Sequence, residues 1–106
     1  MPTTKSYAEF ILEQLSGLPE IAYRQMMGEY ILYYRDKVIG GIYDNRFLVK
    51  LVKSAREKMP EAPLQLPYEG AKEMLLVDNV DNRDFLEELV TSMYDELPEL
   101  KKKKKA

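Results

Sequence analysis

The sequence predicts an α+β fold in which helices pack against a mainly antiparallel sheet. Apolar residues recur with the 3.6-residue period of a helix near both ends of the chain, over residues 7–18 and 85–97. Between these segments lie runs rich in β-branched and aromatic residues, separated by short polar stretches that are typical of turns. In chain order, these patterns predict the elements α-β-β-β-α-β-β-α.

The first predicted helix begins near Ser6. Ser6 and Glu9 have the S-x-x-E spacing of a capping box, in which each side chain satisfies a free backbone N–H of the first turn. Pro19 prevents the helix from continuing further. The apolar positions with helical spacing are Tyr7, Phe10, Ile11, Leu15 and Leu18. Because these positions share one side of the helix, we expect that side to pack against the sheet.

Three strands are predicted next, within the runs EYILYY, VIGGIY and FLVKLV at residues 29–34, 38–43 and 47–52. Two pairs of polar residues separate them, Asp36–Lys37 and Asp44–Asn45. Asp and Asn tolerate the positive φ angles that two-residue hairpin turns require. Each pair is therefore predicted to form a tight turn between antiparallel strands.

Gly40 and Gly41 interrupt the second of these strands. A phosphate-binding loop needs glycines at set spacing before a helix, whereas these two are adjacent and are followed by strand residues. With Asp36–Lys37 as the turn, Tyr33 lies opposite Gly40, where its ring covers exposed backbone. Gly41 then points to the other face, where another element can approach closely. The glycines are predicted to serve packing and not nucleotide binding.

The same register sorts the strand residues onto two faces. The face predicted to be the core carries Ile31, Tyr33, Val38, Ile42, Phe47, Val49 and Leu51. The other face carries Tyr30, Leu32, Tyr34, Ile39, Tyr43, Leu48 and Lys50. Its tyrosines and lysine suit a surface covered by a protein partner, and they suit equally a face that meets water or a helix. The candidate protein-interaction residues are Tyr30, Tyr34, Tyr43 and Lys50.

The second half of the chain is predicted to complete the sheet and its helical cover. A short helix over residues 55–59 ends at Pro60, and two short strands follow near residues 64–68 and 73–77. Asp81 and Asp84 give an acidic variant of the capping pattern, which predicts that the last helix begins there and ends at Pro98.

Several kinds of catalytic site lack the residues they require. The chain has no cysteine and no histidine, which excludes disulfides, thiolate nucleophiles and Ser-His-Asp arrangements and removes the usual zinc ligands. The aspartates at 78, 81 and 84 do not match a calcium loop, because Val80 occupies a ligand position and no glycine lies at the turn. No spacing singles out a glycosidase-type carboxylate pair. The sequence therefore predicts a non-enzymatic protein without a metal or a cofactor.

Charge is distributed unevenly along the chain. Of the 16 Lys and Arg residues, five form the run Lys101, Lys102, Lys103, Lys104 and Lys105, which leaves 11 basic against 18 acidic side chains, a net charge of −7. The acidic part disfavours contact with phosphate backbones. The lysine run is expected to be disordered and either to increase solubility or to tether a polyanion weakly. We therefore predict a domain at residues 1–99 and a lysine-rich tail at residues 100–106.

Nothing in the hydropathy pattern predicts contact with a membrane. The longest unbroken apolar run covers residues 30–34, far short of the roughly 20 residues that a spanning helix needs. The N-terminal residues lack the apolar stretch of a secretory signal. These features predict a cytoplasmic protein.

Three segments carry a resemblance to a known family, namely MMGEY at residues 26–30, GGIYD at residues 40–44 and YEGAK at residues 68–72. With these segments in this order, residues 5–97 resemble the TfoX N-terminal domain family. The resemblance implies a secretion-chaperone-like α+β fold and a link to TfoX proteins, regulators of natural competence that act with the cyclic-AMP receptor protein at promoters. It also implies a stand-alone member that lacks the C-terminal helical domain of full-length competence regulators, and it supplies no catalytic residues.

The sequence leaves three functional hypotheses. The first is a regulatory module that binds another protein, such as a component of the transcription machinery, through the face that carries the four candidate residues. The second is nucleic-acid binding through Lys101–Lys105. The third is a small-ligand sensor with a carboxylate site that no motif reveals. Homodimerisation through a sheet edge or face is compatible with all three.

Overall fold

The computed structural model describes residues 3–97, so the predicted domain boundary at residue 99 and the lysine run lie outside the described residues. The described part forms one six-stranded sheet in the order β1-β2-β3-β4-β6-β5, and every neighbouring pair is antiparallel. The elements are α1 (Lys5–Gln14), β1 (Ile21–Met26), β2 (Glu29–Tyr34), β3 (Lys37–Ile42), β4 (Phe47–Val49), α2 (Lys53–Lys58), β5 (Leu64–Gln65), β6 (Met74–Leu76), α3 (Arg83–Met93) and the short 3₁₀ helix η1 (Tyr94–Glu96). The α+β class predicted from the sequence is confirmed.

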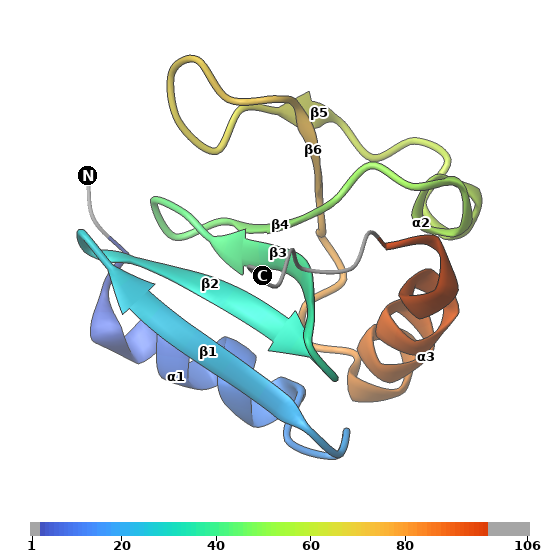
Figure 1. Cartoon of the computed structure of the whole chain (residues 1–106), viewed down its shortest axis with the longest axis horizontal. Coiled ribbons are helices and arrows are strands. Elements are labelled where there is room, and N and C mark those ends of the chain that lie inside the picture. Colours follow the sequence, from blue (N-terminus) through green and yellow to red (C-terminus); the bar gives the residue numbers. More distant parts are fainter. Residues whose placement is uncertain (1–2, 98–106) are drawn as a thin grey trace, which may run out of the picture.

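All three α-helices contribute to a single core against one face of the sheet. Figure 1 shows α1 running along β1 and β2, with α2 next to α3 at the far end of the molecule. The helices begin one or two residues away from the predicted caps. Thr4 caps α1 in place of Ser6, and Asn82 caps α3 in place of Asp81. None of the helices in residues 3–97 combines the length and the hydropathy that a membrane span requires.

The strand β1 is the one element that the sequence pattern does not predict. Its residues IAYRQM lack an alternation of apolar and polar side chains, because all but the first are exposed. The strand forms because Met27 and Gly28 make a two-residue turn, with φ angles of 54° and 84°, that folds it back onto β2. The hairpin places β1 at one edge of the sheet.

The turn between β2 and β3 lies one residue earlier than predicted. Arg35 and Asp36 occupy the two turn positions, with φ angles of 51° and 80°, and Lys37 pairs with Tyr34 inside the sheet. The environment of Lys37 explains the difference. Its ammonium group donates to the Tyr94 carbonyl oxygen at 3.0 Å and lies 4.2 Å from the centroid of that ring. This anchorage holds Lys37 in the strand.

A register shift follows between Leu32 and Tyr33. The earlier turn places Tyr33 opposite Val38, and the shift then places Leu32 opposite Gly40, so the predicted pairing of Tyr33 with Gly40 is wrong. The shift also changes which residues share a face. The buried strand residues that pack with the helices are Tyr30, Leu32, Tyr34, Ile39, Ile42, Phe47 and Val49. This set combines members of both predicted faces, so the predicted division of the sheet is wrong.

The packing role predicted for the two glycines is confirmed, although the contacts differ from those expected. A Cβ atom at Gly40 would collide with the Leu48 carbonyl oxygen and lie 2.7 Å from the Cα of Val49. A Cβ atom at Gly41 would lie 2.5 Å from the Tyr30 carbonyl oxygen and 2.7 Å from the ring of Tyr43. The adjacent strands, and an aromatic ring over Gly41, leave no room for a side chain.

Candidate functional site

The four candidate interaction residues do not share one surface. Tyr30 and Tyr34 are 7% and 5% exposed and belong to the core beneath the helices. Tyr34 packs edge-on against Tyr94, with 5.5 Å between the ring centroids. Tyr43 and Lys50 line a groove on the opposite face of the sheet. The prediction of a common face is therefore wrong, and the register shift at β2–β3 is the physical reason.

The groove that contains Tyr43 and Lys50, here called the open-face groove, has a volume of about 720 Å³. Its floor is the sheet surface that the helices leave uncovered, formed by Ile31, Tyr33 and Val38. Its wall is the connection between β5 and β6, which contributes Tyr68 and further residues of segment 67–73. Figure 1 shows this connection as a long loop beyond the β5–β6 end of the sheet. A sheet and a loop together thus form a concave surface.

Tyr43 is positioned by the turn between β3 and β4. Asp44 and Asn45 form this turn with φ angles of 55° and 58°, which confirms the turn predicted there. The backbone groups of Tyr43 and Arg46 exchange two hydrogen bonds of 2.8 and 2.9 Å across it. The Glu29 carboxylate accepts a third hydrogen bond, from the Asp44 N–H at 3.1 Å. This network fixes the point at which the Tyr43 side chain leaves the backbone.

The wall of the groove, formed by the connection between β5 and β6, is tied to the sheet through Arg46. The Arg46 guanidinium donates from Nε to the Tyr43 carbonyl oxygen at 3.1 Å and from Nη1 to the Gln65 Oε1 at 2.8 Å. Gln65 is the last residue of β5, so the contact holds the start of the loop that carries Tyr68. The Tyr43 and Tyr68 rings then lie 6.3 Å apart, with an angle of 58° between their planes. The side chain of Arg46 therefore links the turn next to Tyr43 to the strand β5, from which the loop with Tyr68 begins.

The polar groups of the groove suit binding better than catalysis. Burial raises the pKa of Tyr43, and the charges of Tyr68 and Glu29 raise it further. The hydroxyl therefore stays protonated and can donate a hydrogen bond at neutral pH. Lys50 and Lys72 add two ammonium groups, and Glu73 adds one carboxylate. An apolar floor with tyrosine hydroxyls and ammonium groups at its border can hold a ligand by burial and hydrogen bonding.

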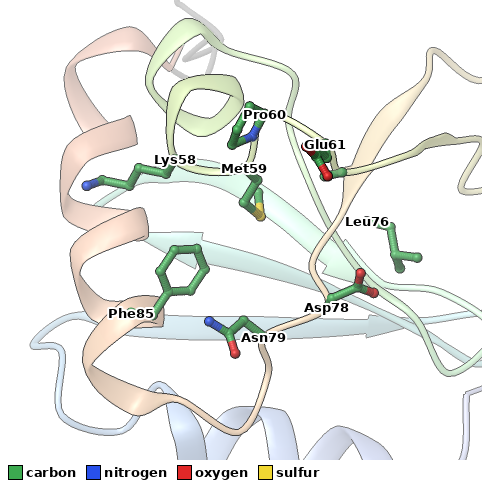
Figure 2. A pocket seen from close by; sticks show the side chains of 9 residues that line it. Lys58, Met59, Pro60, Glu61, Leu76, Asp78, Asn79 and Phe85 are labelled. Atoms are coloured by element: carbon green, nitrogen blue, oxygen red, sulfur yellow. The ribbon is translucent and has the colours of Figure 1, made fainter.

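A second depression lies between α2 and α3 and has a volume of about 470 Å³. Figure 2 shows Met59 and Phe85 inside it, with Lys58 extending away from the carboxylates of Glu61 and Asp78. The Lys58 ammonium instead pairs with the Glu88 carboxylate at 3.3 Å. Within residues 3–97, no group of three or more acidic side chains is arranged to hold a metal ion. The polar side chains here do not converge, so the open-face groove is the stronger candidate site.

Comparison with known proteins defines the family. Residues 13–96 match the TfoX N-terminal domain family. The chain belongs to this family. It is also 38% identical over 80 residues to an uncharacterized 12.7 kDa protein in the trpE 5′ region of Spirochaeta aurantia, a match that covers 76% of this chain and 70% of the relative. No solved structure matches the chain, so the likeness to the secretion-chaperone-like group stays a prediction.

Two of the three segments on which the TfoX-type resemblance rests meet at the open-face groove. Segment 40–44 contributes Gly40 and Tyr43, and segment 68–72 contributes Tyr68, Ala71 and Lys72. The third segment, residues 26–30, forms the hairpin between β1 and β2. Reasoning from the strands alone missed the 68–72 wall because this segment is a loop, not a strand, in the structure. The resemblance of residues 68–72 to the family was the signal in the sequence that could have indicated this part of the site.

Proposed function

We propose that this chain is a non-enzymatic module of the TfoX N-terminal type that acts in transcriptional regulation by binding a protein partner in the open-face groove. The observation that carries the proposal is the meeting of segments 40–44 and 68–72 at this groove. These two segments resemble the family, lie far apart in the sequence and meet at a concave surface. Their meeting favours a binding role for that surface.

The side chains around the groove have the composition of a protein interface. Tyr68 is 64% exposed and Leu51 is 48% exposed, so a partner can bury both. Tyrosine is frequent among the residues that dominate binding energy, because it offers a large rigid ring and a polar hydroxyl. Lys50 and Lys72 border the apolar floor. A partner segment with apolar side chains next to a carboxylate fits this chemistry.

Affinity capture with matched variants tests the proposal. Wild type, Tyr68→Ala and Phe10→Ala are immobilised in parallel, and each captured protein is then titrated in purified form. The cyclic-AMP receptor protein is the first candidate to purify, because TfoX regulators act with it. We expect Tyr68→Ala to weaken binding at least tenfold, which is the loss of an aromatic anchor worth about 1.4 kcal/mol or more.

Phe10→Ala is the matched control, because Phe10 is 39% exposed on α1, outside the groove. It should bind the same partner with unchanged affinity. Equal affinity of wild type and Tyr68→Ala for every purified partner would contradict the proposal, because the groove would then contribute nothing to binding.

A second candidate function rests on the five consecutive lysines at residues 101–105. Neutralising five phosphates on duplex DNA predicts a slope of roughly −4.5 for log K against log salt concentration. A salt-titrated binding isotherm of the whole chain and of a version ending at Glu99 measures this. Binding that the truncation abolishes would support a nucleic-acid role for the lysine run, and no binding by either version at moderate salt would exclude direct DNA contact.

A further inference from the structure

The two edges of the sheet differ in how well they are protected from pairing with another strand. The edge strand β5 has only two residues, and Pro63 and Pro67 lie close on either side of it. Short length and proline are both common means of blocking an edge. The edge strand β1 has six residues without a proline, and Arg24 is its one charged side chain. The edge at β1 therefore lacks the protection that β5 has.

The backbone of β1 offers a regular row of hydrogen-bonding groups on its outer side. The turn at Met27–Gly28 makes Met26 and Glu29 the closing pair of the β1–β2 hairpin. Hydrogen-bonded and non-hydrogen-bonded pairs alternate along an antiparallel ladder. The backbone N–H and C=O groups of Ala22, Arg24 and Met26 therefore form hydrogen bonds with β2. The N–H and C=O groups of Ile21, Tyr23 and Gln25 point away from the sheet.

We propose that β1 pairs antiparallel with β1 of a second copy of the chain, about a two-fold axis at Tyr23. This register uses all three outward-facing residues, because Tyr23 lies opposite Tyr23 of the second copy and Ile21 lies opposite Gln25. The sheets join edge to edge, and the helices of both copies lie on the same side. The surface is separate from the open-face groove, so the inference does not depend on the proposed function.

The charges on β1 favour a second copy as the occupant. Outside the lysine run the chain has 11 basic and 18 acidic side chains, so two copies repel each other over most of their surface. On β1 itself there is no acidic residue. In the proposed register Arg24 lies opposite Ala22 of the second copy, so no like charges lie directly opposite each other along the paired strands. This edge therefore lacks the acidic groups that make the rest of the two surfaces repel each other.

Cysteine cross-linking tests both the interface and its register. Ala22 and Arg24 are exposed, so Ala22→Cys and Arg24→Cys should leave the fold intact. The chain has no cysteine of its own, so any disulfide must join the introduced residues. Opposed residues of a non-hydrogen-bonded pair have Cβ atoms about 4.5–5.5 Å apart, close enough for a disulfide after small movements. We expect the mixture of the two variants to form a disulfide-linked dimer under mild oxidation and each variant alone to form little.

Two results of this experiment would overturn the proposal. Equal cross-linking of either variant alone would indicate another register or random collision. No cross-linking of the mixture at millimolar concentration would show that the edges do not meet.

Sedimentation equilibrium of the unmodified protein gives an independent measurement. An interface of two short strands is smaller than that of a typical stable complex, so we expect a dissociation constant on the order of 100 μM. The apparent mass should rise from 12.4 kDa toward twice that value between about 10 μM and 1 mM. A constant monomer mass over this range would refute the proposal.

Gln25→Pro and Gln25→Ala form the matched pair for the mechanism. Both remove the side chain of Gln25, which is exposed, but only proline removes the outward N–H. We expect Gln25→Pro to weaken dimerisation at least tenfold and Gln25→Ala to dimerise like wild type. Equal dimerisation of the two variants would overturn the backbone-pairing mechanism. Tyr68→Ala should leave dimerisation unchanged, which separates this test from that of the groove.

Discussion

Replacing Tyr34 with alanine tests the assignment of the helix-covered face as the core. The Tyr34 side chain is 5% exposed and packs edge-on against Tyr94 at 5.5 Å. Burying an aromatic side chain removes roughly 200 Å² from water, which at about 25 cal/mol per Å² stabilises the fold by about 4–5 kcal/mol before the cost of the polar hydroxyl. Allowing for that hydroxyl, we expect Tyr34→Ala to lower the free energy of unfolding by about 4 kcal/mol, within the range for aromatic-to-alanine changes in cores.

The assay is urea denaturation followed by circular dichroism, with Tyr68→Ala as the control of the same chemistry. Tyr68 is 64% exposed, so its replacement should cost about 1 kcal/mol. For a domain of this size, a loss of about 4 kcal/mol corresponds to a decrease in Tm of roughly 20 °C. If the free energies of unfolding of the two variants differ by less than about 1 kcal/mol, the assignment of Tyr34 to the core is refuted.

Three further predictions concern stability. Gly40→Ala should lower the free energy of unfolding, measured by urea denaturation, by about 3 kcal/mol or more, because its Cβ would meet strand backbone. Gly70→Ala, at φ 89° with open space around it, should lower it by about 1 kcal/mol. Similar losses for the two variants would contradict the packing argument. Burial raises the pKa of Tyr43, so the unfolded chain loses this proton first, at about pH 10. The free energy of unfolding should therefore fall as pH rises from about 10 through the folded-state pKa, and denaturation between pH 8 and 11.5 should show a smaller fall for Tyr43→Phe. The Arg56 Nη1 donates to three carbonyl oxygens of the 59–62 loop at 2.9–3.3 Å. Arg56→Ala should therefore lower the free energy of unfolding by about 2 kcal/mol. Full stability of Arg56→Lys would show that the planar guanidinium is not needed.

Much of the fold was predictable because it depends on local chemistry. The helical spacing of Ile11 and Leu15, and of the apolar residues of α3, predicts amphipathic helices whether or not the sheet is known. Asp44 and Asn45 form the turn predicted for them because these residue types tolerate positive φ. The candidate site was predicted less well. Tyr43 and Lys50 do line the open-face groove, but Tyr30 and Tyr34 lie on the other side of the sheet.

The sequence by itself determined the α+β class, the helices, most strands, the packing role of the paired glycines and the family. Each of these follows from residue types and spacings within a few neighbours, or from sequence segments that resemble the family. Only the tertiary structure decided the register of β2 on β3. Lys37 is held in its strand by Tyr94, 57 residues away in the chain, and the turn lies one residue earlier as a result. The separate register shift between Leu32 and Tyr33 changes the pairing by one residue, and a one-residue change exchanges the buried and exposed faces. The edge strand β1 and the groove wall at Tyr68 were likewise decided by tertiary structure, since exposed segments carry no hydrophobic period from which to predict them.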